Sequence, residues 1–581
     1  MERKYAFLDK LNETQKKVCI SEDNYVLTAC PGSGKTRTIT YRLAYLAEKY
    51  KESKKINLAI TYTNRAANEI ENRLTNMGID TCNVWTGTIH QFCMKFIVRP
   101  YSMYHNKLNR GYRIIDEFVK EEYLKSIANN MGIKNCYVKN LYKNELVMKE
   151  YVLKLEESKE IDFNMILEYA HEMLQRYSFI AENIAHIVRN IHVDEYQDTN
   201  EKQYAILSII INANPKINLL FVGDVNQAIY GNLGGVAKSV DEIRNLFPIE
   251  FTEECLKGCY RSTQRLTEYY INYEIAQTGV KSLSEIKENK GIIKFNADIS
   301  KEDLADAIAD ILKNELNKGL PESEICIVAP QWYQIYPMAN KLRELMPENN
   351  FDAPDISPIK YDPLNVFFLI TKLLFTQHSG HRLVRRKEAE EIISMLKDDY
   401  GFSIPAKVDK LDVLRSINST QYIEDNGILT IKNTIDNVHK LLHININVEA
   451  KLKSVYDDFF NKIDSRIREH KLPYNCRSME KCFKERNGIV INSIHGVKGE
   501  EYTTMIGFDL LTGHLPHWDY IYNDELRVVR SEETKRMLYV LCSRAKENLY
   551  LFAERGRTTQ KGYLLDTTEE LANCNFIYDV E

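Results

Sequence analysis

A short segment near the start of the chain has the residue types and spacing that bind the phosphates of a nucleotide. Residues 29–36 read ACPGSGKT and follow an apolar run at 25–29. This is the [AG]xxxxGK[ST] spacing of a phosphate-binding loop, in which small residues let backbone N–H groups wrap the β-phosphate. Lys35 would reach the β- and γ-phosphates, and Thr36 would ligate Mg²⁺. The loop residues expected around bound ATP are Gly32, Ser33, Gly34, Lys35 and Thr36.

Two carboxylates at the end of another apolar run could carry out hydrolysis. Residues 191–193 have the composition of a strand end and are followed by Asp194 and Glu195. Asp194 would hold Mg²⁺ through water, while Glu195 would orient and deprotonate the attacking water. In isolation a solvated turn is the better interpretation of such a pair. A phosphate-binding loop in the same chain favours the catalytic interpretation.

The elements that must position these groups alternate between apolar strands and helices. A third apolar strand, 219–224, leads to Gln227, which could bridge the γ-phosphate to the rest of the protein. Strand–turn–helix units of this kind predict parallel α/β cores with helices on both faces of each sheet. Residues 406–470 contain no proline and one glycine, which predicts a mostly helical segment.

Composition limits the class of protein further. A length of 581 residues corresponds to roughly four domains. The net charge of −5 excludes a protein that coats nucleic acid with overall positive charge, but it allows a local basic cleft. The twelve cysteines form no CxxC pair, so no zinc or iron–sulfur site is predicted. The charged N-terminus and the short apolar stretch at 366–375 predict a cytoplasmic protein with no membrane contact.

Ten segments, taken together, resemble the motifs of UvrD/Rep-type superfamily 1 DNA helicases and follow in the order of that family. Each segment alone is weak evidence, but their order along nearly the whole chain makes a chance origin negligible. The segments are 11–18 (LNETQKKV), 29–36, 57–74 (NLAITYTNRAANEIENRL), 86–93 (TGTIHQFC), 161–167 (IDFNMIL), 194–200 (DEYQDTN), 222–231 (VGDVNQAIYG), 259–263 (CYRST), 491–502 (INSIHGVKGEEY) and 532–551 (EETKRMLYVLCSRAKENLYL).

The resemblance implies further contacts with the nucleotide. Arg261 and Arg544 would come from a second core and stabilise charge on the γ-phosphate as arginine fingers, although a solvated salt bridge is the alternative for each. The remaining implied contacts are Gln15 on the adenine edge, Tyr260 on the adenine face, Glu501 on the ribose and Arg37 beside the phosphate loop.

The resemblance also implies a path for single-stranded DNA. Tyr62 occupies the position of an aromatic that stacks on a base, with simple packing at a strand end as the alternative. The other implied DNA contacts are Thr63, Asn64, Thr88, His90, Tyr230 and His495. The chain departs from the family at Asn232 and Leu233, where a tryptophan and an arginine are usual. These departures would weaken the coupling of ATP to DNA.

The implied architecture is α/β, with two RecA-like parallel-sheet P-loop cores, each with a mainly helical insertion. ATP and Mg²⁺ would bind between the cores. The expected boundaries are 1–95 and 180–250 for the first core, 96–179 for its insertion, 251–375 and 485–581 for the second core, and 376–484 for a shortened helical accessory subdomain.

Two functions of different classes are compatible with these motifs. The first is an ATP-dependent translocase or helicase on single-stranded or tailed DNA, with a 3′–5′ direction implied by the resemblance. The second is a nucleotide-sensing regulatory subunit that binds DNA ends or single strands and activates a partner nuclease. The departures at Asn232 and Leu233 are the observation that suggests this second function. Compact chains of this kind also resemble the helicase partner of an OLD-family nuclease in the Gabija phage-defence pair.

Overall fold

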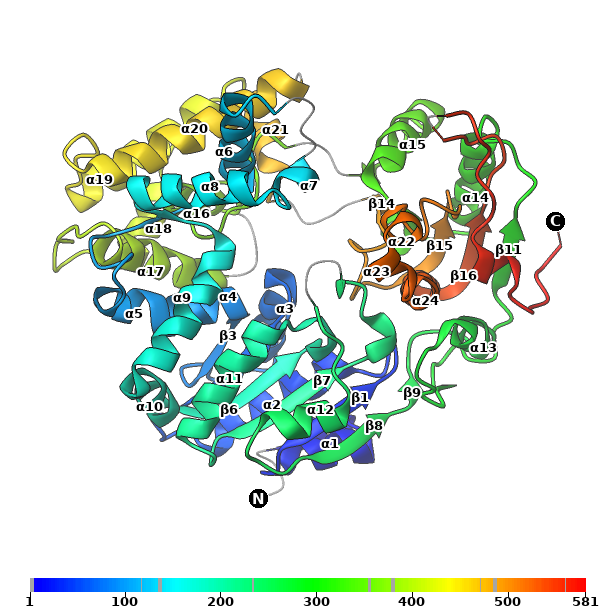
Figure 1. Cartoon of the computed structure of the whole chain (residues 1–581), viewed down its shortest axis with the longest axis horizontal. Helices are drawn as coiled ribbons and strands as arrows, with labels where there is room; N and C mark the ends of the chain where they lie inside the picture. The colour runs from blue at the N-terminus through cyan, green and yellow to red at the C-terminus, as the bar shows by residue number, and fades with distance from the viewer. Residues whose placement is uncertain are drawn as a thin grey trace. The chain divides into compact units, whose positions relative to one another are not determined.

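The chain folds into two compact units, each assembled from segments that lie far apart in the sequence (Figure 1). The first unit contains Met1–Ile89, Tyr177–Pro354 and Arg486–Glu581, and the second contains His90–Arg176 and Asp355–Glu485. The computed structural model describes residues 5–115, 117–133, 138–231, 235–353, 357–377, 382–470, 472–483, 488–559 and 561–580. The departures at Asn232 and Leu233 lie outside the described residues.

The first unit is built around two six-stranded sheets. In the first sheet the strand order is β3-β2-β6-β7-β1-β8, and every neighbouring pair is parallel. Because the strands are parallel, their carboxyl ends meet at one edge of the sheet, where ligands bind in open α/β folds. The strands are β1 (Tyr25–Ala29), β2 (Ile56–Thr61), β3 (Val84–Thr88), β6 (Val188–Asp194), β7 (Asn218–Gly223) and β8 (Thr252–Leu256).

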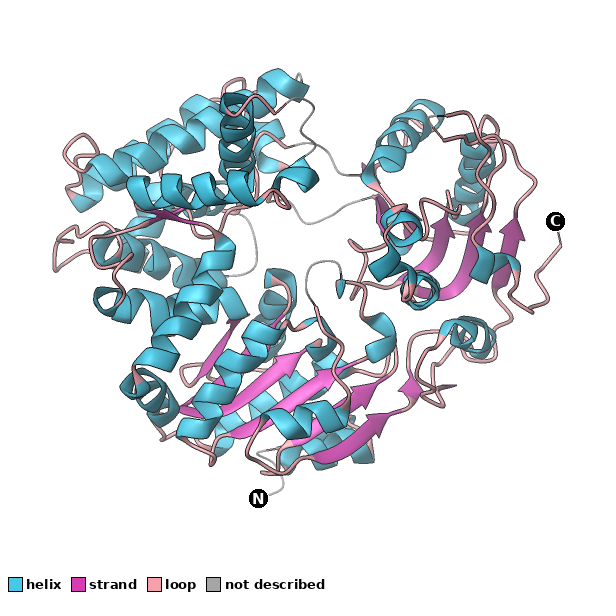
Figure 2. Ribbon diagram, in the orientation of Figure 1, coloured by secondary structure: helices cyan, strands magenta, loops and turns pink. Residues whose placement is uncertain are grey.

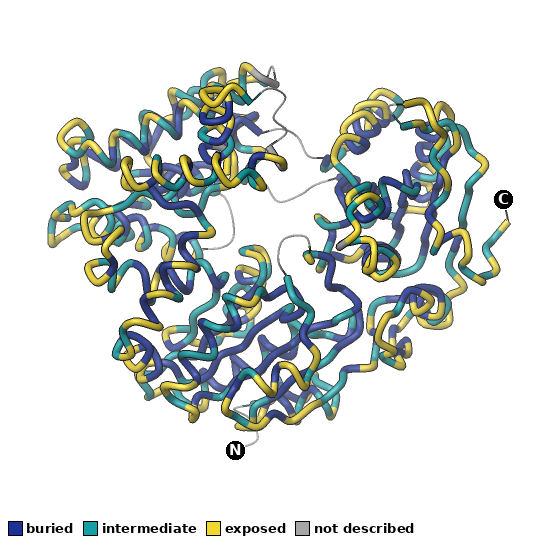
Figure 3. The backbone as a smooth tube through the Cα atoms, in the orientation of Figure 1, coloured by how far each residue is buried: buried dark blue, intermediate teal, exposed yellow. Residues whose placement is uncertain are grey.

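The second sheet has the order β11-β16-β15-β12-β14-β13 and is also parallel throughout. Its strands are β11 (Ile292–Asn296), β12 (Ile325–Ala329), β13 (Phe351–Asp352), β14 (Ile489–Ser493), β15 (Tyr502–Gly507) and β16 (Ala545–Phe552). Helices flank the strands of both sheets (Figure 2), and the inner strands of each sheet are buried along most of their length (Figure 3). A parallel sheet covered on both faces requires continuous apolar strands, which is the pattern of β12. The predicted α/β class with two RecA-like parallel cores is confirmed.

The second unit is mainly helical, with one two-stranded sheet of β4 (Arg113–Ile114) and β5 (Glu160–Ile161). The prediction of a mostly helical segment at 406–470 is confirmed. The apolar stretch at 366–375 forms α16, a helix buried in the core of the unit. Among the described residues, no helix has the length and apolar character needed to cross a membrane. The other helices of eight or more residues are α6 (Glu117–Asn130), α8 (Glu145–Ser158), α9 (Phe163–Arg176), α17 (Arg382–Asp398), α18 (Lys410–Asn418), α19 (Gly427–Leu442) and α20 (Ala450–His470).

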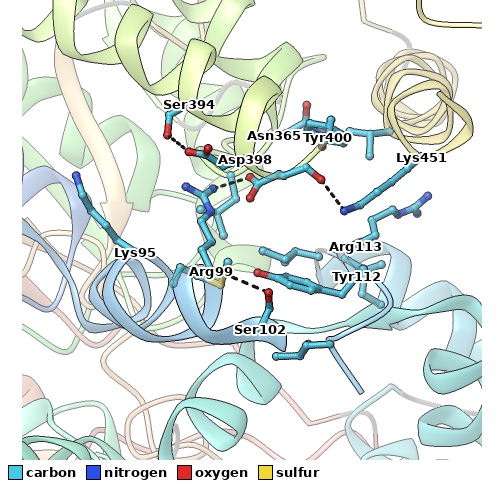
Figure 4. Close-up of a pocket in the computed structure, with 18 of the residues that line it drawn as sticks. Lys95, Arg99, Ser102, Tyr112, Arg113, Asn365, Ser394, Asp398, Tyr400 and Lys451 are labelled. Carbon is cyan, nitrogen blue, oxygen red and sulfur yellow. Dashed lines mark hydrogen bonds and ion pairs between the residues drawn. The ribbon is translucent and has the colours of Figure 1, made fainter. Parts of the chain in front are cut away.

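A pocket of about 820 Å³, lined by both charged and apolar side chains, lies inside the second unit between its two chain segments (Figure 4). Arg99 from one segment contacts Glu391 at 3.1 Å and Asp399 at 3.0 Å on the other. Lys451 donates a hydrogen bond to the carbonyl of Asp399 at 2.9 Å. Burial opposes the charge on Arg99, but the two carboxylates outweigh it and raise the pKa of Arg99. Ion pairs therefore help to join the two segments around this pocket.

We predict that Arg99→Ala destabilises the protein, because it leaves the partly buried Asp399 without the arginine that pairs with it. The expected loss is about 2–3 kcal/mol of unfolding free energy, measured by urea titration followed by circular dichroism. Arg415 is a matched control, since its ion pair with Asp412 is exposed to solvent. Arg415→Ala should change the free energy of unfolding by less than about 0.5 kcal/mol. Equal losses in the two variants would contradict the role given to the Arg99 pair.

Candidate functional site

The phosphate-binding loop joins β1 to α2 (Lys35–Lys49) at the carboxyl edge of the first sheet. Gly32 and Gly34 have φ values of +69° and +84°, in the left-handed region that favours glycine. Gly34 is also the N-cap of α2 and makes no side-chain cap, so the first N–H groups of the helix stay available to an anion. The local geometry is that of a phosphate cradle.

Side chains from two distant segments pack against this loop. A Cβ atom on Gly32 would lie 2.7 Å from Cβ of Arg261, and one on Gly34 would lie 2.8 Å from Nε2 of Gln15. Gln15 also donates a hydrogen bond to the carbonyl of Ser33 at 3.0 Å. The segment 11–18 and the segment 259–263 are thus both brought to the phosphate loop, as the motif resemblance implies.

The residues implied in adenine binding lie close to one another. Tyr260 is half exposed, and its hydroxyl accepts a hydrogen bond from Asn12 at 3.0 Å. Asn12 in turn caps α1 (Glu13–Ile20), the helix that carries Gln15. Arg37 donates to the carbonyl of Lys10 at 2.7 Å, on the same N-terminal segment. An exposed aromatic face beside Gln15 is the arrangement required to hold a purine.

Lys35 and the strand-end carboxylates form a buried charged group. The Lys35 ammonium lies 3.3 Å from the Glu195 carboxylate. Burial opposes the charge on Lys35, but Glu195, Asp224 and Asp194 outweigh it and raise the pKa of Lys35. Burial and the neighbouring Glu195 raise the pKa of Asp194, whereas Lys35 and Lys498 overcome burial and lower the pKa of Glu195. Glu195 is therefore the carboxylate that stays ionised beside Lys35.

The backbone at Glu195 is itself unusual. Its φ of +51° places a non-glycine residue in the left-handed region, which costs about 1–3 kcal/mol. Two hydrogen bonds hold this conformation. The Glu195 N–H donates to the Asp194 carboxylate at 3.0 Å, and the Gln197 amide donates to the Glu195 carboxylate at 2.5 Å. Strain held in place by neighbouring hydrogen bonds is common at active sites.

The oxygen ligands present suit Mg²⁺ bound together with a nucleotide. Thr36 supplies a hydroxyl at the start of α2, and Asp194 supplies a buried carboxylate at the end of β6. Within the described part of the chain, no cluster of three or more His, Cys, Asp or Glu residues could hold a metal ion by itself. A magnesium ion at Thr36 and Asp194 would therefore need phosphate and water oxygens to complete its shell.

A chain of hydrogen bonds links the two sheets at this site. Asp224 follows β7 and accepts a hydrogen bond from the Gln227 amide at 2.7 Å. The Gln227 oxygen accepts one from Arg544, which precedes β16 of the second sheet, at 3.0 Å. Gln197 accepts from the Asp224 N–H at 3.0 Å, so the chain continues to the Glu195 motif. Gln227 is thus in direct contact with a residue of the second core.

Both predicted finger arginines belong to this group. Arg544 is 2% exposed, and burial lowers its pKa to about 9. Arg261 lies against the phosphate loop, with its Nε 2.8 Å from the Glu501 carboxylate and another nitrogen donating to the Ser543 carbonyl at 2.8 Å. Burial opposes the charge on Glu501, but Arg261 outweighs it and lowers the pKa of Glu501. Arg261 is therefore held by Glu501 close to the position of a bound phosphate.

Sequence reasoning missed an ion pair that also links the two sheets. The Lys498 ammonium lies 2.5 Å from the Asp198 carboxylate and donates to the Gln227 carbonyl at 2.5 Å. Both side chains are buried, and burial raises the pKa of Asp198 to about 6. The sequence does contain a signal for this pair, because Asp198 lies in the DEYQD motif and Lys498 lies in the HGVKGEE motif. Neither residue has a role predicted from the sequence.

Three of the residues implied in DNA binding form one aromatic group. The rings of Tyr62 and Tyr230 stack with centroids 4.6 Å apart and planes 27° apart. His495 lies 5.7 Å from Tyr230 between ring centroids and contacts the Ile229 carbonyl through Nε2 at 3.2 Å. Tyr62 therefore packs on another aromatic ring of the same proposed path.

The other residues implied in DNA binding are more dispersed. Thr63 is the N-cap of α3 (Asn64–Asn76), and its hydroxyl accepts from Ala66 N–H at 3.2 Å. Asn64 has a buried side-chain oxygen with no hydrogen-bond partner. Thr88 ends β3 in the first unit. His90 belongs to the second unit, where it contacts Phe163 and burial lowers its pKa to about 4.

The paired parallel sheets, the phosphate loop and the two arginines beside it define a P-loop nucleotide-binding protein with two cores. Residues 11–145 and 137–248 match the UvrD/REP helicase N-terminal domain, and residues 384–556 match the UvrD-like helicase C-terminal domain. The chain therefore belongs to the UvrD/Rep helicases, a family of ATP-dependent DNA helicases, and the predicted resemblance is confirmed.

Curated relatives align with nearly the whole chain. The ATP-dependent DNA helicase PcrA of Staphylococcus aureus (strain Mu50) is 24% identical over 636 aligned residues, covering 94% of this chain and 83% of the relative. The PcrA helicase of Staphylococcus epidermidis (strain ATCC 35984) is 24% identical over 631 residues, with the same coverage.

We predict that Gly34→Ala weakens ATP binding at least tenfold, because its Cβ would collide with Gln15 beside the phosphate loop. Gly78 is the matched control: its φ of +71° imposes a similar backbone strain, but a Cβ there meets no atom within 4 Å. Both variants should lose about 1–2 kcal/mol of stability from the left-handed backbone. Only Gly34→Ala should lose the rise in melting temperature on adding Mg·ATP. Equal responses of the two variants to Mg·ATP would contradict the assignment.

Proposed function

We propose that this chain hydrolyses ATP between its two sheets and uses the cycle to move along single-stranded DNA in the 3′–5′ direction. The hydrogen bond between Gln227 of the first sheet and Arg544 of the second carries this proposal. A nucleotide at the phosphate loop would lie where groups from both sheets already meet. Its binding and release would therefore change the contacts between the cores.

The hydrolytic step uses the charges around the loop. Glu195, kept ionised beside Lys35, accepts the proton of the attacking water. Lys35, Arg261 and Arg544 stabilise the charge that develops on the γ-phosphoryl group. Mg²⁺, when bound, neutralises phosphate charge beside Thr36 and Asp194. Arg261 must exchange Glu501 for phosphate to take part in this step.

The link from nucleotide to DNA runs through two short segments. Gln227 at the nucleotide site is three residues from Tyr230, and Lys498 is three residues from His495. Lys498 contacts the Gln227 carbonyl and lies 5.0 Å from the centroid of the Tyr230 ring. Movement of Gln227 and Lys498 during the ATP cycle would therefore shift the aromatic group of Tyr62, Tyr230 and His495.

A second candidate function is favoured by the sequence at Asn232 and Leu233. Without the usual tryptophan and arginine, nucleotide binding could regulate a partner nuclease on DNA ends with little unwinding, as in an anti-phage defence pair with an OLD-family nuclease. The nucleotide chemistry is the same in the two proposals. They differ in whether the isolated chain separates strands.

We predict that Glu195→Gln lowers the rate of ATP hydrolysis by about 10²- to 10⁴-fold, because an amide cannot accept the proton of water. ATP should still bind, since the phosphate loop and Lys35 are unchanged. Glu201→Gln is the control, because Glu201 pairs with Lys238 of the loop that precedes residue 240 and should leave hydrolysis near the parent rate. Phosphate release in single-turnover assays measures the difference, and hydrolysis that survives in Glu195→Gln would contradict the role of this carboxylate.

Strand displacement on tailed duplexes tests the proposed translocation. The isolated chain should unwind a duplex with a 3′ single-stranded tail and leave a 5′-tailed duplex intact, and single-stranded DNA should stimulate its ATP hydrolysis. DNA-stimulated hydrolysis with no unwinding would favour the regulatory function. Hydrolysis that does not respond to DNA would contradict the proposed translocase.

A further inference from the structure

Helix α15 (Trp332–Leu345) of the second sheet carries aromatic side chains on its solvent face. Trp332, Tyr333 and Tyr336 are 45%, 56% and 39% exposed. The opposite face of the helix is buried and packs on β12 and β14 through residues such as Ile335 and Leu342. An amphipathic helix normally presents polar side chains to solvent, so these aromatics need an explanation outside the core.

Two of the rings form a continuous surface. Trp332 and Tyr336 are four residues apart on one helix face, with ring centroids 6.2 Å apart. Tyr333 turns instead to His514, which its ring meets edge-on at 5.7 Å between centroids. Trp332 and Tyr336 are therefore the pair of aromatic faces left open to a ligand at this helix.

The aromatic pair lies at the same sheet edge as His495. Ala329 at the end of β12 is in register with Ser493 at the end of β14, and Ile494 N–H donates to the Ala329 carbonyl at 3.2 Å. Trp332 follows Ala329 by three residues, and His495 follows Ser493 by two. The helix thus starts beside the segment that carries His495, which contacts Tyr230 and, through it, Tyr62.

We propose that Trp332 and Tyr336 form a base-stacking platform for single-stranded DNA on the second core. The platform extends the aromatic group of Tyr62, Tyr230 and His495, and the inference rests on the translocase function proposed above. Aromatic faces bind successive bases without sequence preference, because every base has a π-face. The occupant is therefore a single strand with exposed bases, independent of sequence.

The affinity for a fluorescent oligothymidylate tests the platform. Trp332→Ala and Tyr336→Ala should each weaken binding about tenfold, in line with the loss of one stacked base. Trp332→Phe should restore most of the affinity, since it keeps an aromatic face. Tyr563→Ala removes another exposed tyrosine, which is 70% exposed and belongs to a different segment of the chain, and should bind like the parent. Circular dichroism melting of each variant separates lost binding from lost folding.

An oligomer of abasic sugars separates stacking from backbone contacts. The tenfold difference between the parent and Trp332→Ala should disappear on this oligomer, because it offers no base to stack. Binding of oligothymidylate should also quench Trp332 fluorescence in a chain with Trp85→Phe and Trp518→Phe.

If the parent binds oligothymidylate but Trp332→Ala and Tyr336→Ala bind it equally well, the platform is wrong and the translocase proposal stands. If the parent does not bind single strands, the translocase proposal itself fails. Loss of self-association in place of DNA affinity would assign the patch to a protein contact and overturn the inference.

Discussion

Charge compensation in a buried group at the edges of two parallel sheets is the constraint on which this site depends. Four carboxylates, Asp194, Glu195, Asp198 and Asp224, are buried or nearly so where the first sheet ends. Lys35 comes from the phosphate loop, while Lys498 and Arg544 come from segments of the second sheet. A buried charge without a partner is costly. The first sheet therefore relies on the second to balance its carboxylates.

The same constraint explains why the site can respond to a nucleotide. A triphosphate brings several negative charges to a loop that already holds Lys35, Arg261 and Gln15. Lys35 and Arg261 are now paired with Glu195 and Glu501, so phosphate must compete with these carboxylates. Exchange of partners at the loop alters the contacts of residues on both sheets. We infer that this exchange is how ATP binding would be converted into relative movement of the cores.

Much of the nucleotide site could be predicted from the sequence, because its groups are neighbours along the chain. Lys35 and Thr36 follow one strand after a five-residue loop, Asp194 ends another strand and Glu195 follows it, so apolar runs and motif spacing suffice to place them. The contacts between sheets could not be predicted in this way. Lys498 and Asp198 are 300 residues apart, and their contact depends on how two separately folded sheets meet. The aromatic face of α15 was missed for a different reason, since Trp332 and Tyr336 belong to none of the motifs.

A structure of the chain with Mg²⁺ and a non-hydrolysable ATP analogue tests the central claim most directly. The account predicts that the analogue lies on the phosphate loop with Lys35, Arg261 and Arg544 within hydrogen-bond distance of its terminal phosphates. The 2.8 Å contact between Arg261 and Glu501 should then be broken. A bound analogue contacted only by residues of the first sheet, with Arg261 still paired to Glu501, would contradict the account.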